Sequence, residues 1–143
     1  MASIVDVLDG LRAAIEAVVV SEPVGQDDTI RTFLPTGQMS RGSRATLVQC
    51  TAPSPILPGY TCSDYAVTVT LSTAYAVSAP EGDARSTYER ALVDAEAVAV
   101  AIQAWGATAD DILRVEQQQG ELDDNGDGWL LVQRTVSLQY RRT

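Results

Sequence analysis

The chain has 143 residues, of which 45% are hydrophobic, and its ten basic and nineteen acidic residues give a formal net charge of −9. We expect one domain over residues 1–143, because this length suits a single core and no composition shift marks a boundary. All ten basic residues are Arg, so the chain lacks the His and Lys of Ser-His-Asp and Cys-His systems, Schiff bases and phosphate loops. The acidic balance argues against electrostatic wrapping of nucleic acid.

Targeting and membrane segments are not expected from the sequence. No apolar run approaches the roughly 18 residues of a membrane span. The first residues, MASIVDVLDG, lack the basic region of a secretory signal peptide.

The N-terminal segment has the pattern of an amphipathic helix. Ser3 and Asp6 form a predicted capping box, and residues 21–25 (SEPVG) end the helix. Its apolar residues repeat at steps of three and four and form one stripe: Ile4, Val7, Leu8, Leu11, Ile15, Val18 and Val19.

A polar stretch follows over residues 26–43, with a short strand expected at 29–34. Arg31, Arg41 and Arg44 make a basic cluster in and beside this stretch. Two interpretations stay open, a solvated loop or a contact with an acidic neighbouring molecule.

Two strands are predicted on either side of a Pro-rich loop. Residues 44–50 suit a strand, and residues 51–61 contain three prolines and a glycine, which favour a loop. Cys50 and Cys62 flank this loop and are either two free thiols or a small disulfide.

Residues 64–77 alternate between large and small side chains, which indicates a strand with two different faces. The larger residues are Tyr65, Val67, Val69, Leu71, Thr73, Tyr75 and Val77. The other face carries only Ala, Thr and Ser, and we interpret it as a surface that lies against another backbone or subunit.

A second helix is predicted over residues 86–105, with Ser86 and Glu89 as a capping box and Gly106 just past its end. The last third suits a β-hairpin, with arms at 112–122 and 129–142. The expected fold class is therefore α+β, an antiparallel sheet packed on one face by two helices, in the order α-β-β-α-β-β.

The acidic turn at 123–128 resembles the start of an EF-hand loop. Asp123, Asn125 and Asp127 precede Gly128, but the position for a bidentate Glu is Arg134 and both flanks are strands. A turn that tolerates unusual backbone angles is the alternative. Adjacent carboxylates, such as the pair at 110–111, point different ways, so no dyad follows from them. We predict no catalytic, cofactor-binding or metal-binding residues, no cofactor and no enzymatic activity.

In the order of its elements and in its hydrophobic pattern, the chain resembles the tail terminator and tail-completion (neck) proteins of long-tailed bacteriophages. The residues that carry the resemblance are MASIVDVLDGLRAAI, DYAVTVTLSTAYAV, STYERALVDAEAVAVAIQAW and WLLVQRTVSLQYRR. The resemblance implies a structural virion protein, made in the host cytoplasm, that forms a homohexameric ring. Such a ring caps the tail tube, contacts the tail tube protein and the head connector or stopper, and lets DNA pass without specific binding.

Contact residues in such an assembly are predicted from exposed loops and strand edges. They are Arg41, Arg44, Tyr65, Val67, Arg141 and Arg142. Other open functions are a head-tail stopper, a minor tail or capsid-decorating protein, a non-viral acidic adaptor or ligand-binding domain, and an enzyme with an all-carboxylate or tyrosine mechanism.

Overall fold

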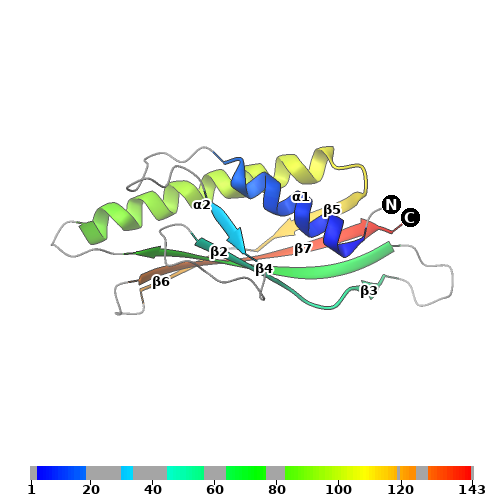
Figure 1. The fold of residues 1–143 in the computed structure, drawn as a ribbon, viewed down its shortest axis with the longest axis horizontal. Helices are drawn as coiled ribbons and strands as arrows, with labels where there is room; N and C mark the ends of the chain where they lie inside the picture. The colour runs from blue at the N-terminus through cyan, green and yellow to red at the C-terminus, as the bar shows by residue number, and fades with distance from the viewer. Residues whose placement is uncertain are drawn as a thin grey trace.

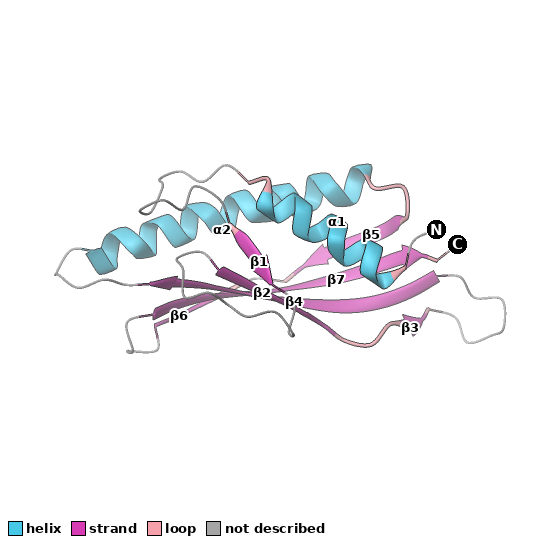
Figure 2. Ribbon diagram, viewed as in Figure 1, coloured by secondary structure: helices cyan, strands magenta, loops and turns pink. Residues whose placement is uncertain are grey.

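The computed structural model describes residues 3–18, 30–33, 45–56, 64–76, 83–118, 120–124 and 129–142. Within these ranges two helices and seven strands alternate along the chain (Figures 1 and 2). They are α1 (Ile4–Glu16), β1 (Arg31–Phe33), β2 (Ala45–Cys50), β3 (Ser54–Pro55), β4 (Asp64–Ala76), α2 (Asp83–Thr108), β5 (Ile112–Gln117), β6 (Glu121–Asp124) and β7 (Trp129–Arg141).

The strands form one sheet in the order β1-β2-β4-β7-β5, with β3 paired to β4 and β6 paired to β7. The centre is the long pair β4–β7, whose register runs from Asp64 opposite Arg141 to Ala76 opposite Trp129. Among the described strands only β1 and β2 run parallel. The predicted α+β class with an antiparallel sheet is confirmed, whereas the predicted order is too short. It has two strands between the helices where the described residues form four, and two after the second helix where they form three.

Both helices lie on the same face of the sheet (Figures 1 and 2). The apolar residues that face them come from α1, from the end of α2 and from alternate positions of the central strands, and together form the main core. Its buried members are Val7, Leu8, Leu11, Ile15, Val18, Ile30, Val48, Val67, Val69, Leu71, Ile102, Val136, Leu138 and Tyr140. The large face predicted for residues 64–77 is thus the helix-covered face.

The first helix follows its predicted pattern closely at the N-terminus. The Ser3 hydroxyl accepts the Asp6 backbone N–H, and Asp6 Oδ2 accepts the Ser3 N–H, so the capping box is confirmed. These hydrogen bonds, the backbone one first, lower the pKa of Asp6. The helix ends at Glu16, earlier than predicted, while Val18 is still buried.

The second helix is longer than the predicted 86–105. It begins at Asp83, so Ser86 is not its N-cap, and it continues past Gly106 to Thr108. Gly106 is not a helix-ending residue but a point of close approach. A Cβ at this position would lie 2.4 Å from Cγ2 of Val115, so only glycine lets α2 come this near to β5.

The predicted hairpin arms pair as expected, but the first arm is divided. β5 and β6 both pair with β7, and residues 118–120 separate them. At Gly120 a Cβ would lie 2.7 Å from the Gln133 carbonyl oxygen, so the backbones approach closely there. The Pro-rich segment also contains a strand, β3, which pairs with the edge of β4. Proline is compatible with such an edge position because no ladder donor is needed.

Candidate functional site

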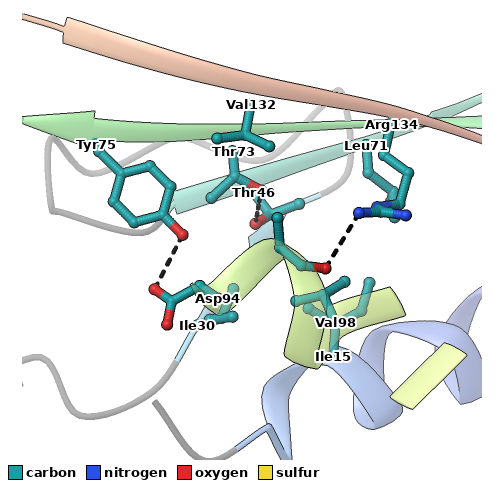
Figure 3. Close-up of a pocket in the computed structure, with 11 residues that line it drawn as sticks. Ile15, Ile30, Thr46, Leu71, Thr73, Tyr75, Asp94, Val98, Val132 and Arg134 are labelled. Carbon is teal, nitrogen blue, oxygen red and sulfur yellow. Dashed lines mark hydrogen bonds between the residues drawn. The ribbon is translucent and has the colours of Figure 1, made fainter. Parts of the chain in front are cut away.

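A small internal cavity lies between α2 and the helix-covered face of the sheet (Figure 3). Its volume is about 20 Å³, which is enough for about one water molecule and far below the size of ligand pockets. The lining residues are Ile15, Ile30, Thr46, Leu71, Thr73, Tyr75, Asp94, Ala95, Val98, Val132 and Arg134. This cavity is therefore part of the packing of α2 and not a binding site for an organic ligand.

A buried carboxylate of α2 is held by the sheet at this cavity. Asp94 is 1% exposed, and its Oδ2 accepts a 3.0 Å hydrogen bond from the Tyr75 hydroxyl of β4 (Figure 3). Beside it, the hydroxyls of Thr46 and Thr73 are 2.8 Å apart and share a hydrogen bond. Buried polar groups are costly unless they are hydrogen-bonded, so the Tyr75–Asp94 bond ties α2 to β4 and the Thr46–Thr73 bond ties β2 to β4.

A half-buried arginine of β7 makes a second connection to α2. Arg134 Nη2 donates to the Ala95 carbonyl at 3.1 Å (Figure 3), and Nη1 donates to Oε1 of Gln117 at 2.9 Å. Gln117 in turn donates from Nε2 to the Ala99 carbonyl at 2.9 Å. Burial lowers the pKa of the Arg134 guanidinium, and both acceptors compensate for the water it has lost.

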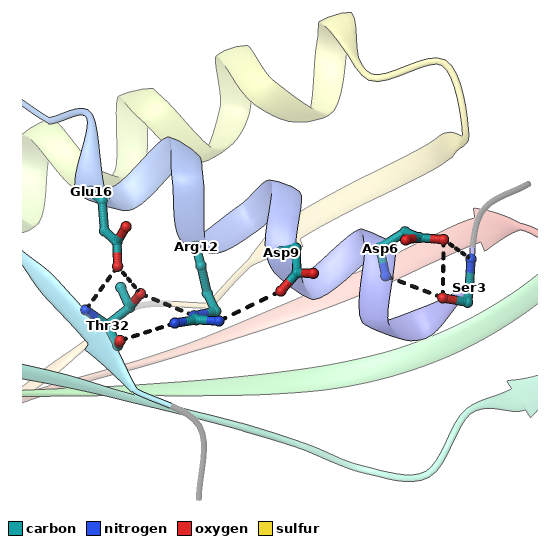
Figure 4. A network of polar contacts seen from close by, with 6 residues as sticks. All are labelled: Ser3, Asp6, Asp9, Arg12, Glu16 and Thr32. Atoms are coloured by element: carbon teal, nitrogen blue, oxygen red, sulfur yellow. Dashed lines mark hydrogen bonds and ion pairs between the residues drawn. The ribbon is translucent and has the colours of Figure 1, made fainter. Parts of the chain in front are cut away.

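Polar side chains also connect α1 to the short strand β1 (Figure 4). The Thr32 hydroxyl donates to Oε1 of Glu16 at 2.6 Å and accepts from Nε of Arg12 at 3.1 Å. Arg12 further donates to the Thr32 carbonyl at 3.3 Å and forms an ion pair with Asp9 at 3.5 Å. Since these contacts all join groups of the same chain, we interpret the network as a support for the fold.

The opposite face of the sheet carries small or uncharged polar side chains over β4 and β7, and no described helix lies on it (Figure 2). Its central positions alternate with the buried residues of the core, so their side chains point away from the helices. They are Ala66, Thr68, Thr70 and Ser72 of β4 and Gln133, Thr135, Ser137 and Gln139 of β7. We call this surface the open face.

The predicted contact residues Tyr65, Arg141 and Arg142 lie together at one end of the β4–β7 pair. Tyr65 stacks on Tyr140 with ring centroids 6.0 Å apart, and Arg142 is exposed. Arg141 already has a partner within the chain, because its Nε donates to Oδ1 of Asp64 at 2.9 Å and its Nη2 to Oδ2 at 3.4 Å. This pairing, through the hydrogen bond first, raises the pKa of Arg141.

One predicted contact residue is wrong and two are not described. Val67 is 3% exposed and belongs to the core, because it is on the helix-covered face of β4, so its side chain cannot reach another molecule. Arg41 and Arg44 lie outside the described residues. Cys50 is a free, exposed thiol, and Cys62 is outside the described residues.

Metal-binding and membrane-spanning features are both absent from the described ranges. No three His, Cys, Asp or Glu residues gather there as a metal would require. Of the acidic turn, Asp123 belongs to β6, and residues 125–128 are outside the described part. Neither described helix combines the length and the apolar character needed to cross a bilayer.

Sequence reasoning missed Asp94, Arg134 and Gln117. A signal for Asp94 existed, since it lies three residues after Ala91 and four before Val98 in the predicted apolar stripe. Arg134 likewise falls between Val132 and Val136 on the inward face of its strand. No family model and no curated protein matches this chain. The candidate functional features are therefore the open face and the edges of the sheet.

Proposed function

We propose that this chain is a structural virion protein that forms a ring at the end of a bacteriophage tail, as a tail terminator does. In this role the copies form a homohexamer that contacts the tail tube protein on one side and the head connector or stopper on the other. The protein acts through its surfaces, without a cofactor and without catalysis.

The observation that carries the proposal is the sheet covered on one side only. Both helices pack on one face, and the central positions of β4 and β7 on the open face carry small or uncharged polar side chains. The Ala, Ser and Thr side chains among them lose less side-chain entropy than long side chains do when another molecule covers them. A face of this kind suits broad contact with another protein better than capture of a small ligand.

The polar networks support the same interpretation. Arg134, Gln117, Asp94 and Thr32 all direct their hydrogen bonds to groups of this chain. They hold the helices on the sheet, as a rigid building block needs. The net charge of −9 fits a ring through which DNA passes, because a negative lumen repels phosphates.

The test is the assembly state of the purified chain, alone and with isolated tail tubes. Native mass spectrometry is expected to show a ring of several 15.2-kDa chains, and negative-stain images are expected to show it at the tube end. A monomer at every concentration, with no binding to tubes, contradicts the proposal.

The same images separate the alternatives within a virion. Labelled protein seen at the neck below the head favours a stopper. Labelled protein along the tube favours a minor tail protein, and labelled protein on the shell favours a decorating protein. A stable monomer that binds none of these parts favours a non-viral acidic adaptor domain.

A further inference from the structure

The strand β5 is an open edge of the sheet. It is last in the strand order, with β7 on one side and no described strand on the other. An open edge exposes unpaired backbone N–H and C=O groups, which pair readily with another chain.

The hydrogen-bond pattern tells which groups of β5 point outward. The Gln118 N–H donates to the Thr135 carbonyl of β7 at 2.9 Å, so the even positions of this arm face β7. Backbone groups alternate along a strand, and those of Val115 and Gln117 therefore point away from β7. A partner strand that joins this edge would pair with these two residues.

Two opposite charges stand on this edge, one residue to either side of Val115. Arg114 and Glu116 form an ion pair with each other, and their side chains are 60% and 57% exposed. By register they stand on the open face, opposite Gln139 and Ser137. Their order makes the edge complementary to itself: in an antiparallel pair centred on Val115, each Arg114 lies opposite the other copy's Glu116.

An apolar side chain flanks the same edge. Leu113 occupies the β-bulge between Ile112 and Arg114 and is 44% exposed. A second copy at this edge would cover part of this side chain, which the single chain leaves in water.

We propose that β5 pairs antiparallel with β5 of a second copy of this chain, in the register that places Val115 opposite Val115. The two Val115 residues exchange backbone hydrogen bonds. Arg114 and Glu116 then form a two-by-two arrangement in which each carboxylate has a guanidinium beside it and another across from it. The result is one continuous sheet with a twofold axis, and the charges select its register.

This inference does not depend on the proposed function. A twofold contact closes after two copies, so it cannot by itself build a ring, which needs a different, head-to-tail contact. The two proposals can therefore fail separately.

The experiment exchanges the two charges one at a time and then together. Arg114→Glu places two carboxylates opposite each other, and Glu116→Arg places two guanidinium groups opposite each other, so each is expected to raise the dimer dissociation constant about tenfold or more. The matched control is the double variant R114E/E116R, which keeps composition and net charge and restores every opposite pair. Sedimentation equilibrium measures the masses, and circular dichroism checks the fold.

Mixing provides a sharper test of the register. At a concentration that lies between the dissociation constant of the wild-type dimer and those of the single variants, R114E and E116R are each expected to be monomeric alone, yet to form a heterodimer when mixed, because every facing pair is then opposite in charge. In a background with both native cysteines replaced by Ser, Arg114→Cys and Glu116→Cys chains are expected to form a disulfide with each other. Neither is expected to do so with itself, because facing residues are about 4.5 Å apart between Cα atoms.

Several results would overturn the inference. A wild-type chain that stays monomeric at its highest soluble concentration would do so. So would a double variant as impaired as the single ones, or a mixture that forms no heterodimer and no disulfide. A ring that persists unchanged in R114E would also refute the edge contact while leaving the proposed function standing. A wild-type dimer without rings would support the edge contact and count against the ring.

Discussion

Replacing Arg134 with Met is predicted to loosen α2 from the sheet. Met keeps a long unbranched side chain but removes the donors to the Ala95 carbonyl at 3.1 Å and to Gln117 at 2.9 Å. Hydrogen bonds from charged donors contribute about 1.5–3 kcal/mol each when buried. Because Arg134 is only half-buried and Met recovers some packing, we expect a loss of about 2 kcal/mol for the two bonds together.

The assay is urea unfolding followed by circular dichroism. With a slope of about 1–3 kcal/mol per molar urea for a small protein, the midpoint is expected to fall by about 1 M. Arg142→Met is the control, since Arg142 is exposed at the end of β7, and its effect should stay within about 0.5 kcal/mol. An Arg134→Met effect no larger than that of the control would refute the role given to Arg134.

A double-mutant cycle tests whether Arg134 and Gln117 act together. Gln117→Leu alone removes the hydrogen bond to the Ala99 carbonyl and leaves Arg134 with one acceptor fewer. Since each residue bonds the other, the double variant is expected to lose about 1 kcal/mol less than the sum of the single losses. Strict additivity would show that the two side chains stabilise α2 independently.

Three further predictions concern the core and the first helix. Tyr75→Phe removes a donor to the buried carboxylate of Asp94 and is expected to cost about 1–3 kcal/mol in urea unfolding; no loss would contradict this role. Gly106→Ala is expected to destabilise the fold despite the better helix propensity of Ala, and Val115→Ala should suppress that loss; a stabilised Gly106→Ala would refute the close approach. The lowered pKa of Asp6 means that the unfolded state binds its proton first as the pH falls, so this contribution is present above about pH 4 and lost below it. In Asp6→Asn the free energy of unfolding should therefore fall less steeply as the pH is lowered. An unchanged pH dependence in acid would refute the role of Asp6.

The elements that the sequence predicted well have strong local signals. The first helix has a regular stripe and a capping pair, Ser3 and Asp6, so its start could be placed to the residue. Large and small side chains alternate without interruption over the thirteen residues of β4, so its two faces can be assigned before the fold is known. Local pattern also placed the two arms of the hairpin.

The errors arose where tertiary contacts override local signals. Glycine is typical of a helix end, but Gly106 lies inside α2, where the lack of a side chain lets the helix approach Val115. Gly120 lies in the break between β5 and β6, where a Cβ would meet the Gln133 carbonyl oxygen. Neither contact can be read from neighbouring residues, since each depends on an element distant along the chain.

The candidate contact residues show the same limit. The sequence predicts Val67 as a contact residue because residues 64–77 are expected at an edge of the sheet. β4 lies instead between β2 and β7, and Val67 is in the core. Arg141 stays a predicted contact residue, and its ion pair with Asp64 is visible only once the register of β4 and β7 is known.

The measurement that tests the central claim most directly is the native mass of the purified chain over a wide concentration range. If the protein is a ring-forming structural subunit, a discrete assembly of several 15.2-kDa chains, expected to be six, must form and must bind to tail tubes. A chain that remains monomeric throughout, and that leaves tail tubes unoccupied, would contradict the account.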